Sequence, residues 1–407
     1  MSYRYIRGKW TNGDYYDCGV NPDGQLAIDI PLGAFGRLKV EQDEPQVQVD
    51  FRYGVDPAIT SANVTGIGSV SSDNEFADVA TGAQASSSAI LETRRFLKYS
   101  TGEGGRAYFT AVFDTPATGN NQFVGFGTDN NGLFFGYQDT AFGLLRRSDG
   151  VDNFIPQTTW NVDTMDGTGP CGMTLDPSKG NVYSISFQWL GFGQLTFFME
   201  CSKSGKLIPV HRIQYTNANT RTSLRNPSFP MRIENVNTTN ATDIHLKSPS
   251  LAAFTEGKRR LLGLTWSTNN TKTVTSTSFI NLFTLRSKTT FNGLDNFVPA
   301  FLRVLSASVT GNKTAVIELV KNATLGGTPS FADVNASSVM EVDVAGTTVT
   351  GGQALLQIVL NTETTILEEL ANLEVELIRG DTITVGAALV GAGSTECSCS
   401  LTWLEDR

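Results

Sequence analysis

The sequence contains few of the residues on which most catalytic and nucleic-acid-binding sites depend. Its 407 residues include only two histidines, so a nucleophile activated by histidine has few candidates. Lysine and arginine number 31 against 40 aspartates and glutamates, and the net charge of −9 argues against a broad nucleic-acid-binding face. No apolar run approaches the roughly 20 residues that a membrane-spanning helix needs. These absences favour a rigid scaffold over a reaction centre.

Cysteines are also few. Cys397 and Cys399 stand two residues apart on an expected strand, where we predict that they point to opposite faces, and Cys18, Cys171 and Cys201 are isolated. This pattern is neither a disulfide framework nor a CxxC metal pair, and it predicts free thiols in a reducing compartment. The start of the chain lacks the apolar stretch of a secretory signal, so we expect synthesis in a cytosol.

What the sequence does contain is short apolar segments separated by turn-forming residues. Two aromatic-rich segments, Val182–Leu190 and Gly193–Glu200, are joined at a Gly-Phe-Gly break. Apolar residues with a period of two, bounded by Gly, Pro, Asn and Asp, predict the β-strands of a sandwich. We therefore predict an all-β protein, with two β-sandwich or jelly-roll-like modules preceded by an N-terminal β-rich docking arm.

Composition divides the chain into three regions. Residues 1–80, with a polar, small-residue stretch over Thr60–Ser88, predict an arm and connector that are stabilised by docking onto another protein. Residues 81–250 are dense in Phe and Gly and predict the first sandwich. Residues 251–407 are richer in Thr and β-branched residues and predict the second. Within the second sandwich, Glu363–Leu373 fits a short helix or a loop followed by a strand equally well.

The candidate site residues lie in and near the aromatic segments. Aromatic rings stack on the apolar faces of sugars, and Phe192 and Trp160 are the candidates for contact with a glycan, whereas alternation predicts that most neighbouring rings belong to the core. Asp163 and Asp166 stand in a loop that resembles part of an oxygen-ligand site for Ca²⁺, but the loop lacks the spacing and closing glutamate of an EF-hand. The alternative is a simple loop of turn-forming residues. The tripeptide Arg379–Asp381 is expected to be a hairpin turn.

Several segments resemble structural proteins of tailed bacteriophages. These segments are residues 122–137 (QFVGFGTDNNGLFFGY), Trp160–Gly169, Leu175–Gly193, Val210–Pro230 and the N-terminal Leu26–Gly54. The closing Ser398–Glu405 is similar to the terminal strand of phage appendage subunits, which often end in Trp-x-Glu. The resemblance implies a virion protein of the capsid- or tail-appendage type, assembled in the host cytoplasm. It also implies other virion proteins as partners, attachment through the N-terminal region, and a homo-oligomer, for which a trimer is the expected state.

Three functions are therefore open at this point. The main hypothesis is a non-enzymatic appendage or decoration protein of a tailed-phage virion, with its β-modules projecting outward. The alternative is a carbohydrate-binding host-receptor or adhesion protein, and both can hold if the virion protein also contacts a host surface glycan. A glycan-cleaving enzyme is a further alternative, although no pair of carboxylates stands out. No cofactor is expected other than Ca²⁺ in the Asp163–Asp166 loop.

Overall fold

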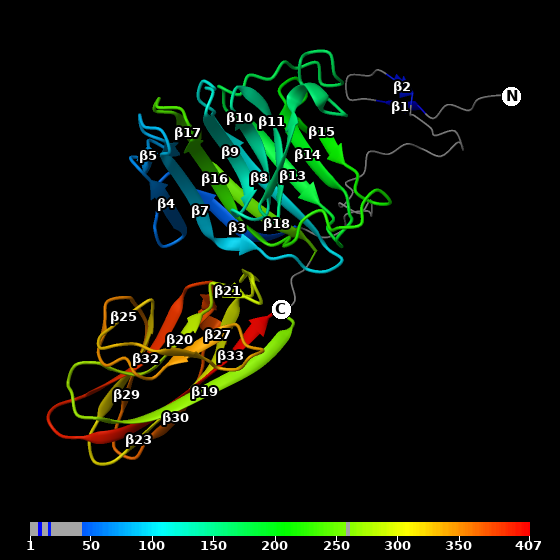
Figure 1. Ribbon diagram of the computed structural model, residues 1–407. Helices are drawn as coiled ribbons and strands as arrows, with labels where there is room; N and C mark the ends of the chain where they lie inside the picture. The colour runs from blue at the N-terminus through cyan, green and yellow to red at the C-terminus, as the bar shows by residue number, and fades with distance from the viewer. Residues whose placement is uncertain (1–6, 10–14, 18–42, 258–260) are drawn as a thin grey trace.

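The computed structural model shows an all-β protein built from two β-sandwiches (Figure 1), and it describes residues 7–9, 15–17, 43–257 and 261–407. The predicted fold class is confirmed. Within these ranges there is no α-helix, only two single-turn 3-10 segments, Gln157–Thr159 and Ala371–Leu373. None of the helical segments found in these ranges has the length and apolar character that crossing a membrane would require.

The first sandwich consists of a seven-stranded and a six-stranded antiparallel sheet. The order across the larger sheet is β12 (Val151–Pro156), β11 (Ala141–Ser148), β10 (Gly132–Gln138), β9 (Asn120–Gly127), β16 (Phe229–Asn237), β7 (Ser88–Leu97) and β4 (Thr60–Thr65). The order across the smaller is β15 (Lys206–Ile213), β14 (Leu195–Cys201), β13 (Asn181–Phe187), β8 (Gly104–Ala111), β18 (Ser250–Glu256) and β3 (Glu44–Asp50). A small sheet adjoins them, made of β17 (His245–Ser248), β6 (Phe76–Ala80) and β5 (Ser69–Asp73).

Aromatic rings fill the space between these two sheets, because alternate residues of each strand point inward. On β13, Tyr183 and Phe187 are fully buried. The ring of Phe135 on β10 has its centroid 4.8 Å from that of Tyr183 and 5.5 Å from that of Phe197 on β14. Most rings of the aromatic segments thus belong to the core, as the alternation predicted.

The strands between residues 44 and 80 belong to the first sandwich and not to a separate arm. β3 pairs with β18 and β4 pairs with β7. Phe51 is fully buried in the core. The polar stretch Thr60–Ser88, expected to be a connector, forms strands instead. Its few apolar residues, such as Val79, alternate with polar residues that either reach solvent or have hydrogen-bond partners. The expected boundary at residue 80 is therefore wrong.

Two further boundaries can be compared with the sequence analysis. β18 ends at Glu256 and β19 begins at Gly263, so the division between the sandwiches lies there and not at residue 250. Of the N-terminal arm, the expected strands between residues 25 and 40 lie outside the described residues. The ranges that are described there form a short hairpin of β1 (Arg7–Lys9) and β2 (Tyr15–Asp17).

The second sandwich also has two principal sheets. The five-stranded sheet contains, in order, β19 (Gly263–Val274), β33 (Thr395–Asp406), β23 (Ala300–Thr310) and β30 (Thr365–Glu369), with β31 (Glu376–Leu377) also paired to β23. The six-stranded sheet contains β26 (Phe331–Asp333), β27 (Met340–Asp343), β20 (Ile280–Ser287), β32 (Thr382–Leu389), β24 (Ala315–Lys321) and β29 (Gln353–Leu360). Two short pairs complete it: β21 (Thr290–Phe291) with β22 (Leu294–Asp295), and β25 (Thr324–Leu325) with β28 (Val349–Thr350).

In the second sandwich, one prediction was wrong, and the structure decides between the two alternatives left open for Glu363–Leu373. Cys397 and Cys399 are both buried, because residues two apart on a strand share a face, so the expectation of opposite faces was wrong. Burial raises the pKa of their thiols to about 11 for Cys397 and about 12 for Cys399, which keeps both protonated. Residues Glu363–Leu373 form strand β30 and a 3-10 turn, not a helix.

The two sandwiches meet at an apolar contact surrounded by ion pairs. Phe96 of the first sandwich lies 4.8 Å, between ring centroids, from Phe297 of the second. Arg379 lies in a tight turn, as expected, but the turn joins β31 to β32 in a different sheet, so the expected hairpin is wrong. The Nη2 of Arg379 is 3.2 Å from a carboxylate oxygen of Glu92 on β7. Lys98 pairs with Asp406 at 2.8 Å, which places the C-terminal strand beside the first sandwich (Figure 1).

Candidate functional site

The Gly-Phe-Gly break is a tight turn between β13 and β14 that exposes two large apolar side chains. Leu190 is 52% exposed and Phe192 is 37% exposed. The amide of Gly193 donates to the carbonyl of Trp189 at 2.7 Å, and a Cβ on Gly193 would lie 1.6 Å from the carbonyl oxygen of Gln188, so only glycine fits there. Leu190 has a φ of 39°, which is rare for a residue other than glycine.

Contacts beneath the turn hold this backbone in place. The amide of Leu190 donates to the hydroxyl of Tyr99 at 3.2 Å. The ring of Tyr99 lies 5.1 Å from that of Trp189, and the indole nitrogen of Trp189 donates to the carbonyl of Leu224 at 3.0 Å. Because these partners come from three separate segments, the exposed side chains stand on a rigid base.

A second ring extends the exposed surface. The centroid of the Tyr215 ring lies 6.4 Å from that of Phe192, with 36° between the ring planes. The guanidinium of Arg146 on β11 lies 5.6 Å from the Tyr215 ring, and Thr216 donates its hydroxyl to the carbonyl of Phe192 at 2.9 Å. We call the surface formed by Leu190, Phe192 and Tyr215 the Phe192 surface.

The sequence singled out Phe192 but missed Tyr215 and Arg146. Tyr215 follows β15 at the start of a polar loop, and Arg146 lies near the end of β11. Only the sheet topology, which brings these loops to one end of the sandwich, places them beside the turn. The sequence signal that could have pointed to Tyr215 is an aromatic residue at the edge of a polar loop.

Trp160, the other predicted glycan contact, is part of the core. It is 4% exposed, and its ring lies 6.0 Å from that of Phe135 and 6.3 Å from that of Phe142. The 3-10 turn Gln157–Thr159 carries the chain from β12 toward the interior at this point. The ring of Trp160 is therefore not available for stacking on a ligand. The prediction that Trp160 contacts a glycan was wrong.

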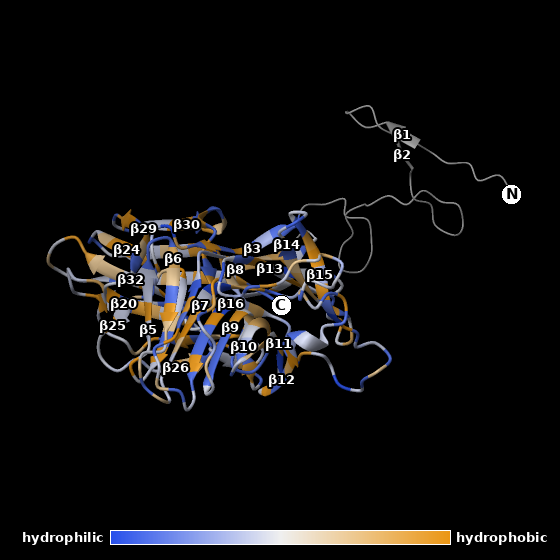
Figure 2. Ribbon diagram, turned by 90° about the horizontal axis from the view of Figure 1, so that it is seen from above, coloured by the Kyte–Doolittle hydropathy of each residue, from blue (hydrophilic) through white to orange (hydrophobic). Residues whose placement is uncertain are grey.

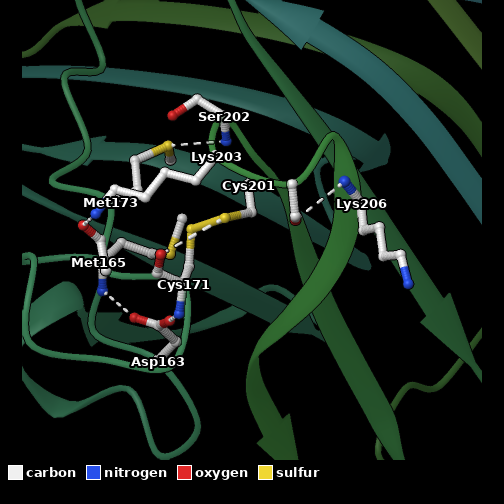
Figure 3. The surroundings of a disulfide bond; sticks show 10 residues. Asp163, Met165, Cys171, Met173, Cys201, Ser202, Lys203 and Lys206 are labelled. Carbon is white, nitrogen blue, oxygen red and sulfur yellow. Dashed lines mark hydrogen bonds between the residues drawn. A yellow bond between two sulfur atoms is a disulfide. The ribbon is translucent and has the colours of Figure 1, made fainter. Parts of the chain in front are cut away.

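Asp163 holds a loop together through both of its carboxylate oxygens (Figure 3). One oxygen accepts a hydrogen bond from the amide of Met165 and the other from the amide of Cys171, each at 2.8 Å. The side chain is 2% exposed, and a Cβ on Gly169 would lie 2.0 Å from it, so the loop closes tightly over the carboxylate. These contacts are those of a structural residue.

Asp166 lies on the same loop but is exposed. One oxygen accepts from both the amide and the hydroxyl of Thr168, at 2.9 and 2.6 Å, and these hydrogen bonds hold the pKa of the carboxyl below its usual value. Over the part of the chain that the structure describes, no cluster of three or more His, Cys, Asp or Glu side chains could hold a metal ion. The loop of turn-forming residues accounts for Asp163 and Asp166 without Ca²⁺.

The same loop is tied to β14 by a disulfide bond between Cys171 and Cys201 (Figure 3). The expectation that both thiols are free is therefore wrong. The two cysteines are separated by 30 residues, and no spacing rule links them. They meet because the loop after Trp160 folds back over the end of β14. Cys18 lies outside the described residues.

Neither histidine is arranged as a general base. The imidazole of His211 is 8% exposed, its Nδ1 accepts from the amide of Asn161 at 3.2 Å, and burial lowers its pKa. His245 contacts the carboxylate of Asp78 at 2.9 Å on the small sheet. Both imidazoles thus have partners within the fold.

The outward face of the six-stranded sheet carries a second group of aromatic residues. Tyr108 and Phe254 meet edge to face, with centroids 5.7 Å apart and planes at 78°. Arg106 donates to the hydroxyl of Tyr108 at 3.2 Å, and its guanidinium lies 6.0 Å from the Phe198 ring. All four side chains are half-buried, so each exposes a smaller fraction of its surface than Phe192 does.

A cleft of about 740 Å³ lies between the two sandwiches. Its charged groups neutralise one another: Lys321 lies 2.8 Å from Asp381, and Arg95 lies 3.5 Å from Glu376. Arg94 donates to the carbonyl of Pro57 at 2.7 Å. The cleft is consequently part of the joint between the sandwiches, and it carries no surplus of one charge for a ligand.

No protein-family model and no curated protein matches the chain. Solved structures that are similar include the cellulose-induced protein Cip1, at 13% identity and a TM-score of 0.34, over 51% of this chain and 96% of that one. They also include the VIP36 exoplasmic/lumenal domain bound to Ca²⁺ and a mannose-containing glycan, at 10% identity and a TM-score of 0.32, over 54% and 92%. A putative β-glucanase from Mycobacterium abscessus matches at 13% and 0.34, over 49% and 93%. Similarities this low carry no argument about function.

Proposed function

We propose that the first sandwich recognises a carbohydrate through the Phe192 surface. The observation that carries this proposal is an exposed aromatic side chain on a rigid, strained turn, beside a second ring and a guanidinium. Adjoining exposed apolar side chains often mark a binding surface, and strained backbone conformations cluster at ligand sites.

The chemistry of the surface suits a sugar. Apolar C–H faces of pyranose rings stack on aromatic faces, and Phe192 and Tyr215 place two rings side by side, with centroids 6.4 Å apart. Arg146 and the side-chain amide of Asn219 supply donors for sugar hydroxyls at the same end of the sandwich, with Asn219 already bonded to the carbonyl of Tyr215 at 3.3 Å. An uncharged glycan needs this combination of a ring surface and a few donors.

Binding fits this surface better than hydrolysis does. Cleaving a glycosidic bond needs two carboxyl groups about 5–10 Å apart. The two segments that build the surface, residues 188–194 and 214–224, contain neither Asp nor Glu. A hydrolytic site would have to take both carboxylates from other parts of the chain.

The test is glycan binding by the full chain and by three variants on an array of host surface polysaccharides. Phe192→Ala should weaken binding about tenfold, which corresponds to the loss of one ring stack of roughly 1.4 kcal/mol. Leu207→Ala is the matched control, because Leu207 on β15 has the same exposed fraction, 37%, and should leave binding unchanged. Loss of binding in Tyr108→Ala but not in Phe192→Ala would move the site to the sheet face and overturn the assignment. Absence of binding to any glycan would overturn the function.

We also propose that the chain is a structural component of a tailed-phage virion, which would present this surface to the host cell. The support is the resemblance of its segments to phage structural proteins. Mass spectrometry of purified particles tests this role, and particles that lack the protein would exclude it. Each proposal can be refuted without the other, because the glycan array tests the isolated chain and mass spectrometry tests the purified particles.

A further inference from the structure

Among the described residues, the five-stranded sheet of the second sandwich has β19 at one edge, and β30 followed by the two-residue β31 at the other. Next to β30, the amide of Leu370 donates to the carbonyl of Arg303, and the carbonyl of Thr364 accepts from the amide of Val309. The backbone N–H and C=O groups of even-numbered residues in this segment therefore point toward β23. The backbone N–H and C=O groups of Thr365, Leu367 and Glu369 therefore point away from the sheet. On β19, the carbonyl of Leu262 accepts from the amide of Arg407, so the backbone groups of even-numbered residues point toward β33. The backbone groups of Thr265, Ser267 and Asn269 therefore point away from the sheet.

Monomeric proteins usually protect a sheet edge with proline, bulges, charged side chains or a very short edge strand. β30 has two of these features, because it has five residues and exposes Glu368 and Glu369, whereas β19 has almost none. β19 runs for twelve residues with a single charge, Lys272, whose Nζ already donates to the carbonyls of Asn281 and Val344. Apolar side chains are exposed along both edges, with Leu264 at 50% and Leu367 at 69%. β29, the edge of the facing sheet, lies beside β30 and exposes Val359 at 63% (Figure 2).

The two edges differ in charge. The segment 363–374 around β30 contains four glutamates and no lysine or arginine, and Glu368 and Glu369 are exposed. β19 contains no acidic residue, and the sequence just before it is Lys-Arg-Arg. Two copies of β30 paired with each other would bring like charges together, which destabilises a strand pair. An acidic edge and an edge without acidic residues fit each other instead.

We propose that the occupant of the β30 edge is the β19 edge of a second copy of this chain. The five-stranded sheet then continues from one copy to the next through backbone hydrogen bonds, with Leu367 packed near Leu264 of the neighbouring copy. Because this contact is head-to-tail, an open row of copies has one unpaired edge at each end. Only a closed ring of copies pairs every edge. Its specificity comes from the glutamates of β30, which would repel a second β30 but meet no acidic residue on β19. Its affinity comes from the paired backbone groups and the covered apolar side chains.

The test uses prolines that block one edge at a time. Leu367→Pro and Ser267→Pro each remove an outward N–H, which an edge strand tolerates because that N–H has no partner within the sheet. Analytical ultracentrifugation of the full chain should show an oligomer, and each variant alone should be monomeric. An equal mixture of the two variants should form a dimer and nothing larger, because each copy keeps one usable edge. The matched controls Leu367→Thr and Ser267→Thr keep the N–H and should remain oligomeric.

Other results would overturn the proposal. A wild-type chain that is monomeric at all concentrations excludes the contact, and a mixture of proline variants that stays monomeric excludes head-to-tail pairing. If a proline variant fails to fold, as judged by circular dichroism, Glu368→Lys combined with Glu369→Lys replaces it. Reversing these exposed charges should weaken association at least tenfold, whereas Glu75→Lys, on an exposed turn of the first sandwich, should not. Equal association of both would overturn the proposal.

Discussion

The two sandwiches share an architecture but stabilise it differently. Among the twelve largest fully buried side chains, only Trp403 and Phe283 belong to the second sandwich, and the other ten form or adjoin the core of the first. The first sandwich can support long loops and an exposed aromatic turn because a dense aromatic core and a disulfide hold them. The second has an aliphatic core, and it leaves edges and apolar side chains uncovered. The two proposals made above fall on either side of this contrast: glycan binding on the first sandwich and pairing between copies on the second.

The largest effect should come from removing the one large ring at the centre of the second core. Trp403 is fully buried, and its indole nitrogen donates to Glu405 at 3.3 Å. Trp403→Ala should cost roughly 3–5 kcal/mol of unfolding free energy in the second sandwich only. Calorimetry of the full chain should then resolve two transitions, with only one of them lowered.

The control for that prediction is Thr402→Ala, at the neighbouring half-buried position on the opposite face of β33. It should shift the second transition by less than about 1 kcal/mol. If Trp403→Ala lowered both transitions equally, the two cores would act as one cooperative unit, and the comparison between the sandwiches would lose its basis.

A smaller effect, confined to the first sandwich, should follow removal of the Cys171–Cys201 bond. The bond closes a loop between residues 30 apart, and such a cross-link typically contributes roughly 2–4 kcal/mol by restricting the unfolded chain. Changing both cysteines to alanine should lower the first transition and leave the second in place. Reductant should lower the wild-type transition similarly and have no further effect on the double variant. A wild-type transition insensitive to reductant would show that the bond adds nothing to stability.

The sequence predicted what depends on local patterning. Period-two alternation predicted the strands and the burial of most aromatic rings, and the glycines marked the Gly-Phe-Gly turn. It did not give contacts made by segments far apart in the chain. The Cys171–Cys201 bond, the burial of Trp160 and the approach of Tyr215 to Phe192 each depend on how the sheets stack. The polar stretch between residues 60 and 88 was misinterpreted because its side chains are small, and strand pairing supplied the stability that its own apolar area lacks.

The joint between the sandwiches offers a weaker test. Arg379 is 3.2 Å from Glu92 and 3.7 Å from Asp295, and its guanidinium lies over Phe297 at 5.1 Å. Arg379→Ala should reduce the coupling between the modules by about 1 kcal/mol, seen as wider separation of the two calorimetric transitions. Arg52→Ala is the control, because Arg52 pairs with Asp50 in an exposed ion pair within one module. An unchanged separation in Arg379→Ala would show that the apolar contact alone couples the sandwiches.

The smallest effect should be a dependence on pH that only the first sandwich shows, because both histidines lie there. Burial alone would lower the pKa of His245, but its hydrogen bond to Asp78 and the nearby carboxylates of Asp243 and Asp114 outweigh burial and raise the pKa above 6.5. The protonated form is therefore favoured by folding. This stabilisation is fully present below the unfolded pKa of about 6.5 and is lost as the pH rises through the folded value. Because the side chain is 42% exposed, the effect should stay below about 1 kcal/mol.

Between pH 6.5 and 8.5, the first transition should fall slightly, and His245→Gln should abolish that fall. The buried His211, whose pKa is lowered, acts on the acid side of this window, so His211→Gln should leave the fall intact. A nuclear magnetic resonance titration giving His245 a pKa at or below 6.5 would contradict the prediction.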